Sequence, residues 1–169
     1  TAQHWRNGRE LNEDEMNQTR VAELLHKIHG SRPLLTMLKR MEMEPITPDI
    51  MLNKINASLS REVLTHHVVR RALTYLEDHI PNLDARFFTV VHGDVNHNNW
   101  LLSDRDELYL VDWEGAMIAD PAIDIGMLLY NYVPQNKWSQ WFKTYGVEES
   151  VNLNKRMKWY TVIQAIGLI

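Results

Sequence analysis

The sequence contains no cysteine, and this absence excludes several kinds of chemistry at once. Disulfide frameworks, thiolate zinc sites and cysteine nucleophiles all need that residue. Glycine is also scarce: the chain has seven glycines, and none belongs to a closely spaced triplet after a strand-like run. A glycine-rich phosphate loop is therefore not predicted. A strand of the Val-Ala-Ile-Lys type, whose lysine would pair with nucleotide phosphates, is missing as well.

Long apolar runs and an excess of positive charge are likewise absent. No window approaches the roughly 18 consecutive apolar residues that a membrane-spanning helix needs, so no membrane association is expected. The formal net charge of −4 argues against a nucleic-acid partner. The apolar fraction of 44% and the charged fraction of 24% are typical of a globular domain. A chain without cysteine suits a reducing compartment, and we expect a cytoplasmic location.

The length of 169 residues is sufficient for a single domain with its own core, which we expect to span residues 1–169. The chain opens at Thr1 without a methionine and closes inside the apolar run 160–169. Natural helices usually end at glycine, asparagine or a basic last turn. We therefore expect both ends to be cuts in a longer protein.

Most of the chain has the apolar spacing of helices. Pro33 is expected to open a short helix that Pro45 and Pro48 stop, and Ser60 is a plausible N-cap for one long amphipathic helix ending at Pro81. The segments with helical spacing are 12–28, 34–43, 60–80, 125–130, 138–145 and 151–169.

The period of the apolar residues changes between residues 87 and 112. Residues 87–91 form a compact β-prone run, and residues 101–102 and 108–111 form two short strands. Residues 103–107 between them have the composition of a turn, which predicts a hairpin. The expected fold class is therefore mainly α with a small β-hairpin region, that is, α+β.

The candidate chemistry lies in this β-rich region. The run from His92 to Asn99 has the His-x-Asp-x-x-x-x-Asn spacing of a kinase catalytic loop, in which the aspartate accepts the substrate hydroxyl proton and the asparagine holds magnesium. Asp112 follows the second strand of the hairpin, where its carboxylate would lie beside Asn99. Magnesium prefers such oxygen ligands and completes its shell with phosphate oxygens and water.

Three ordered segments resemble the aminoglycoside phosphotransferase and choline kinase family. They are the His-Gly-Asp-(four residues)-Asn loop at 92–99, the hydrophobic-Asp-Trp-Glu segment at 111–114 and the Asp-Pro-x-x-Asp segment at 120–124. Residues 5–11 resemble the segment after the hinge between the two lobes in this family, and residues 24–29 resemble the helix that follows it.

The resemblance implies the C-terminal lobe of a protein-kinase-like fold, with the N-terminal lobe missing. It implies ATP-dependent phosphoryl transfer to a hydroxyl of a small metabolite, with Asp94 as catalytic base and Asn99 and Asp112 as Mg²⁺ ligands. Asp124 would brace the catalytic loop, and His92 is expected to orient that loop through hydrogen bonds. The parts that hold nucleotide phosphates would belong to the missing lobe, so the chain alone is expected to be inactive. An exposed lobe face could lead to a dimer of the fragment.

The identity of the acceptor is less constrained. The Asp-Trp-Glu triplet looks closer to the choline and thiamine kinase branch than to the antibiotic-modifying one. The resemblance therefore favours a choline-, ethanolamine- or thiamine-like alcohol as acceptor and leaves an aminoglycoside as the other possibility. Glu114 and the aromatic rings of Trp113, Trp138 and Trp141 are candidates for contact with a cationic acceptor. The alternative for these aromatic residues is core packing, which their helical spacing also predicts.

Two other classes of function are compatible with the same residues. The first is a non-catalytic binding module that kept a kinase-like lobe without its nucleotide lobe. The second is a metal-dependent hydrolase, in which His92, Asp94 and His97 would form a transition-metal site. The hydrolase hypothesis leaves Asn99 and Asp112 without roles.

Overall fold

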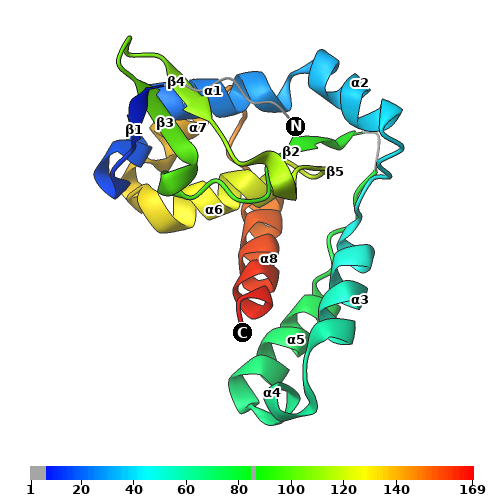
Figure 1. The fold of residues 1–169 in the computed structure, drawn as a ribbon. Coiled ribbons are helices and arrows are strands. Elements are labelled where there is room, and N and C mark those ends of the chain that lie inside the picture. The colour runs from blue at the N-terminus through cyan, green and yellow to red at the C-terminus, as the bar shows by residue number, and fades with distance from the viewer. Residues whose placement is uncertain (1–6, 85–86) are drawn as a thin grey trace.

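The structure is a computed structural model that describes residues 7–84 and 87–169. Helices predominate, and two small antiparallel sheets lie among them (Figure 1). The α-helices are α1 Thr19–His29, α2 Arg32–Arg40, α3 Pro48–Ser58, α4 Arg61–Thr65, α5 His67–Asp78, α6 Ala122–Tyr132, α7 Trp138–Tyr145 and α8 Val151–Gly167. Short 3₁₀ helices are η1 Glu13–Asn17, η3 His97–Asn99, η4 Trp113–Gly115 and η5 Gln135–Lys137. The strands are β1 Gly8–Glu10, β2 Thr89–Val91, β3 Trp100–Ser103, β4 Leu108–Leu110 and β5 Met117–Ala119.

The predicted hairpin is confirmed as β3 and β4, which pair antiparallel with Trp100 opposite Leu110. The Ser103 hydroxyl closes its turn by accepting hydrogen bonds from the backbone amides of Arg105 and Glu107. Strand β1 was not predicted; it adds a third strand on the other edge of β3. Residues 5 and 6 of the segment compared with the family hinge lie outside the described residues.

The prediction of one helix over residues 12–28 is wrong. The segment divides into η1 and α1 at Gln18, whose backbone is extended (φ −70°, ψ 148°). Glu15 gives a reason for the division: its carboxylate accepts the backbone N–H of Asn12 at 2.9 Å and pairs with Arg9. These bonds close η1 as a separate turn, and Met16 anchors it in the core with no exposed surface.

The helices between residues 44 and 80 also differ from the prediction. Pro48 was predicted to stop a helix, but it is the first residue of α3. Proline is favourable at this position because the backbone N–H that it lacks would have no hydrogen-bond partner within the helix. Ser60 caps a helix as predicted, accepting from the amide of Val63 at 3.2 Å. That helix, α4, ends at the extended residue His66, and α5 starts anew. The apolar stripe continues from α4 into α5, so it does not indicate that the helix is interrupted at His66.

The C-terminal helix α8 connects the two parts of the helical core. Close packing of α8 on α6 depends on Gly126, since a Cβ atom there would lie 3.0 Å from the carbonyl oxygen of Met157. On α8, Trp159 is fully buried and donates its indole N–H to the carbonyl of Leu76 in α5. Figure 1 shows α3, α4 and α5 as a group beside the end of α8, away from the sheets. No helix in the described part of the chain is long and apolar enough to cross a membrane.

Candidate active site

The loop between β2 and η3 carries the His-Gly-Asp run and depends on a glycine. Gly93 has a φ of 86°, in the left-handed region that favours glycine. A Cβ atom at this position would lie 2.9 Å from the carbonyl oxygen of Gly115 and 2.9 Å from the methyl carbon of Met117. The loop therefore lies directly against the segment that joins η4 to β5, and a side chain at Gly93 would separate them.

The carboxylate of Asp94 is exposed and held by two side-chain amides. Its Oδ1 accepts from Nδ2 of Asn96 at 2.7 Å, and its Oδ2 accepts from Nδ2 of Asn99 at 3.1 Å. The same amide of Asn99 also donates to the backbone carbonyl of Asp94 at 2.9 Å. The carboxylate thus has a fixed direction while one side stays open to solvent, as a proton acceptor needs.

The hairpin pairs Asn99 with Val111, the residue before Asp112. The backbone N–H of Val111 donates to the carbonyl of Asn99 at 2.9 Å, so the residue after β4 is paired with the residue before β3. Asp112 follows in the left-handed conformation (φ 61°, ψ 65°), which aspartate tolerates better than most residues, and its side chain is exposed.

The donor set at this position suits magnesium. The side-chain amide nitrogen of Asn99 donates to Asp94, so the amide oxygen of Asn99 is the atom that could bind a metal ion, and the carboxylate of Asp112 is a second candidate ligand. Mg²⁺ that is bound together with nucleotide phosphates commonly takes only one or two ligands from the protein. Within the described ranges, no group of three or more His, Cys, Asp or Glu side chains is placed to hold a metal ion.

His92 is fully buried, and both of its ring nitrogens contact the backbone. The bonds fit a ring that donates from Nε2 to the carbonyl of Val111 at 2.8 Å and accepts at Nδ1 from the amide of Asp94 at 3.3 Å. Its ring also meets the indole of Trp113 edge to face, with centroids 4.8 Å apart. His92 therefore has no nitrogen free for a metal in this arrangement, which counts against the hydrolase hypothesis.

Asp124, in the first turn of α6, is buried without any exposed surface and accepts three hydrogen bonds. The backbone amides of His92 and Gly93 donate to its two oxygens at 2.8 and 2.9 Å, and His29 Nε2 lies 3.0 Å from Oδ2. The positive end of the helix dipole also favours a carboxylate here. These contacts connect the loop 92–99 with α6 and, through His29, with α1.

Tyr145 extends this network into α7. Its hydroxyl lies 2.6 Å from Nδ1 of His29, and burial, followed by the charge of Asp124, raises its pKa well above the ordinary value. The hydroxyl therefore stays protonated and can donate to His29, whose other nitrogen then donates to Asp124. Neither His29 nor Tyr145 was predicted to take part in the site, because no local motif connects them with the loop 92–99.

Asp120, the other carboxylate of the Asp-Pro-x-x-Asp segment, holds the start of α6. It is 1% exposed, accepts from the amide of Ala122 at 3.0 Å and pairs with Arg156 of α8 at 2.6 Å. The nearby hydroxyl of Tyr160 is also buried, and burial followed by Asp120 raises its pKa. Asp120 thus fixes the position of α6 on α8, while Asp124 reaches the loop.

The four residues predicted to contact substrate have different surroundings. Trp138 and Trp141 are 8% and 5% exposed and pack in the core, where Trp138 donates to the carbonyl of Val133 and Trp141 stacks on Tyr145. These contacts favour core packing over a cation site for both residues. Trp113 is half-buried against His92 and donates to the carbonyl of Leu110. Glu114 is exposed at the protein surface.

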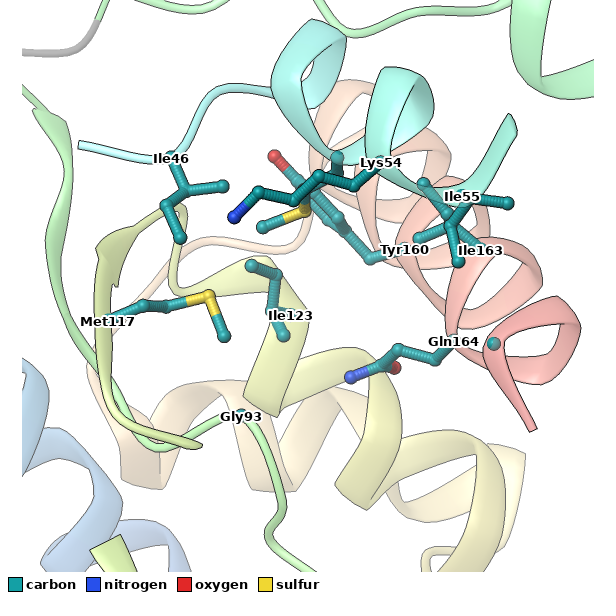
Figure 2. Close-up of a pocket in the computed structure, with 11 residues that line it drawn as sticks. Ile46, Lys54, Ile55, Gly93, Met117, Ile123, Tyr160, Ile163 and Gln164 are labelled. Carbon is teal, nitrogen blue, oxygen red and sulfur yellow. The ribbon is translucent and has the colours of Figure 1, made fainter. Parts of the chain in front are cut away.

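A cavity of about 270 Å³ adjoins the loop 92–99, and no motif in the sequence indicated it. Gly93, the residue before Asp94 in the chain, forms part of its wall, while Asp94 is not among the described residues that line it. Figure 2 shows side chains from α3, β5, α6 and α8 around this space, most of them apolar. A mostly apolar cavity with a few polar groups beside a potential base is the usual form of a small-molecule site.

The chain as a whole matches a known family. Residues 2–160 match the model of the phosphotransferase enzyme family, and the chain belongs to that family. The family predicted from the motifs is therefore confirmed. Members of the family are small-molecule kinases.

Solved structures share the fold at low sequence identity. A macrolide 2′-phosphotransferase type I has a TM-score of 0.67 and 17% identity, over 98% of this chain and 60% of that one. The choline kinase LicA from Streptococcus pneumoniae has a TM-score of 0.71 and 15% identity, over 94% and 57% of the two chains. The spectinomycin phosphotransferase APH(9)-Ia, in complex with ADP and spectinomycin, has a TM-score of 0.64 and 14% identity, over 98% and 56%. The fold is thus kinase-like, and the chain spans less than two thirds of each of these proteins.

Proposed function

We propose that this chain is the C-terminal catalytic lobe of an ATP-dependent kinase that phosphorylates a hydroxyl of a small metabolite. The observation that carries the proposal is the hydrogen-bonded group of Asp94, Asn99 and the strand that precedes Asp112, in a chain that belongs to a phosphotransferase family. The ADP in the spectinomycin phosphotransferase complex supports a nucleotide as phosphoryl donor.

In the proposed reaction, Asp94 orients the acceptor hydroxyl and takes its proton as the oxygen attacks the γ-phosphorus of ATP. A new P–O bond forms to the acceptor, the bond to the bridging oxygen breaks, and ADP leaves. Asn99 and Asp112 would hold Mg²⁺, which neutralises phosphate charge when it is bound. The amides of Asn96 and Asn99 keep the Asp94 carboxylate in position for this proton transfer.

His92 and Asp124 have supporting roles in this proposal. His92 connects the loop with the carbonyl of Val111 next to Asp112, so it keeps the base and the metal ligands in one rigid unit. Asp124 holds the loop by accepting hydrogen bonds from the backbone amides of His92 and Gly93. Both act by positioning, and neither is expected to exchange a proton with substrate.

The contacts to the nucleotide phosphates are assigned to a lobe that precedes Thr1. The absence of a glycine-rich loop and of a lysine-bearing strand from the sequence supports this division. The test is to express the 169-residue chain and a chain lengthened by the upstream coding sequence, each with ATP, Mg²⁺ and a panel of alcohols. Phosphorus NMR should detect ADP and a phosphate ester with the longer chain alone. A longer chain that binds alcohols and never transfers phosphate would favour a non-catalytic binding module instead.

A further inference from the structure

The cavity beside Gly93 has one charged side chain in its wall. Eleven residues line it, and Lys54 is the charged one among them; no carboxylate contributes to the part of the wall that the structure describes. Lys54 extends from α3 with its ammonium group toward the space, and no ion-pair partner for it occurs within residues 7–84 and 87–169. Its charge is therefore available to a ligand.

The rest of the wall is apolar, apart from one amide. The apolar surface includes the side chains of Ile123, Ile163 and Met117. The side-chain amide of Gln164 extends into the cavity from α8 (Figure 2). Tyr160 is the one aromatic residue of this lining, and its hydroxyl is buried rather than presented to the cavity. Such a wall binds an apolar body and has room for one or two polar contacts.

This composition opposes a cationic acceptor. A bound ammonium group needs a carboxylate or several aromatic faces, whereas here it would meet Lys54 and a single ring. A carboxylate or phosphate would instead form a charge-assisted hydrogen bond with the Lys54 ammonium. In Figure 2, Lys54 and Gly93 lie on either side of Ile123, so an acidic group at Lys54 leaves the opposite end of the ligand near the loop that carries Asp94.

We infer that the acceptor is an apolar hydroxy acid whose acidic group binds Lys54 and whose hydroxyl points toward Asp94. This inference rests on the proposed phosphotransferase function and specifies its substrate class. It differs from the cationic alcohol that the Asp-Trp-Glu triplet and four candidate side chains favoured in the sequence; of those four, Trp138 and Trp141 pack in the core. Lys54 is then the residue that determines specificity.

The test compares three probes of the same size and shape: para-hydroxymethyl benzoate, para-hydroxymethyl benzylamine and para-xylene glycol. Dissociation constants are measured by NMR titration of the 169-residue chain, following the signals of Gly93 and Gln164. The acid should bind roughly three- to tenfold more tightly than the neutral glycol, as expected for one partly exposed charged contact, and the amine should bind more weakly than the glycol. An amine that binds as tightly as the acid, or no binding of any probe at millimolar concentration, overturns the inference.

Variants identify the residue responsible. Lys54→Met keeps the aliphatic stem and should reduce acid binding to the level of the glycol, while Lys54→Arg should retain the preference. Lys27→Met, on the exposed face of α1, is the matched control and should change nothing. A preference for the acid that survives Lys54→Met contradicts the assignment.

The two proposals fail separately. Acid binding that depends on Lys54, without phosphoryl transfer by the longer chain, would refute the kinase and leave the acid-binding cavity. Transfer to the amine in preference to the acid would retain the kinase and refute the hydroxy acid.

Discussion

Replacing Asp124 with asparagine tests how the catalytic loop is held. The carboxylate is completely buried and accepts from His92, Gly93 and His29 at 2.8 to 3.0 Å. An asparagine can place its oxygen at the Oδ2 position and keep two of these donors, but its NH₂ group then faces the amide of Gly93. The hydrogen bond from the Gly93 amide to the carboxylate is lost, and the Gly93 N–H and the asparagine NH₂ are both left buried without an acceptor.

The expected loss follows from these contacts. A buried donor without a partner costs about 1–3 kcal/mol, and the remaining bonds lose the charge that strengthened them. We expect Asp124→Asn to lower the free energy of unfolding by about 2–4 kcal/mol, and Asp124→Ala by about 3–5 kcal/mol, because all three donors then lose their acceptor. Such losses are large against a typical stability of about 5–15 kcal/mol.

The assay is urea unfolding followed by circular dichroism, combined with amide hydrogen exchange. In Asp124→Asn, exchange of the Gly93 amide should accelerate more than exchange of the His92 amide, because only the first bond is lost outright. Asp104→Asn, in the exposed hairpin turn, is the control and should change stability by less than about 0.5 kcal/mol. A stability of Asp124→Asn equal to that of the control, or equal exchange at the two amides, would refute this account of the loop.

Three further perturbations test other parts of the structure. Gly93→Ala should destabilise the chain by about 1–3 kcal/mol in urea, because alanine is strained at a φ of 86° and its Cβ would press on Gly115; wild-type stability would show that the loop has another conformation. Glu15 has its pKa lowered from 4.5 to about 2, chiefly by the hydrogen bond from Arg9, so its stabilising contribution is complete above pH 4.5 and is lost as the pH falls through about 2. Glu15→Gln should therefore lose less stability than wild type between pH 7 and pH 3 in urea titrations, and equal losses would contradict the shift. Trp141→Ala should lower the free energy of unfolding by about 3–5 kcal/mol, because it removes a large side chain from the core. A variant with unchanged stability and weaker acceptor binding would instead indicate that Trp141 contacts the substrate.

The hairpin and the position of Asp112 after its second strand were predictable because they are local. The loop from His92 to Asn99, the turn after Ser103 and the carboxylate of Asp112 occur within a short stretch, so residue spacing determines their neighbours. The network behind the loop was not predictable in this way. His29 is 95 residues from Asp124 and 116 residues from Tyr145 along the chain, and only the packing of α1 on α7 and α6 brings them together.

The errors in helix prediction have local physical causes. Apolar periodicity continues through Gln18 and His66, and it does not register that the backbone becomes extended at each. Pro48 is compatible both with the end of one helix and with the start of the next. It starts α3, where the Thr47 hydroxyl caps the helix by accepting from the amide of Ile50. Three residues of α3, Met51, Lys54 and Ile55, line the cavity. Because α3 was not predicted, the cavity was not predicted either.

The most direct test of the proposed function is the turnover of the lengthened chain with Asp94→Asn. Asparagine preserves the size of the side chain but cannot accept the hydroxyl proton as a carboxylate does, so kcat should fall by about 10²- to 10⁴-fold. The urea midpoint should stay close to that of wild type, because the Asp94 side chain is exposed. Wild-type turnover by this variant at saturating ATP and acceptor would contradict the assignment of Asp94 as the base.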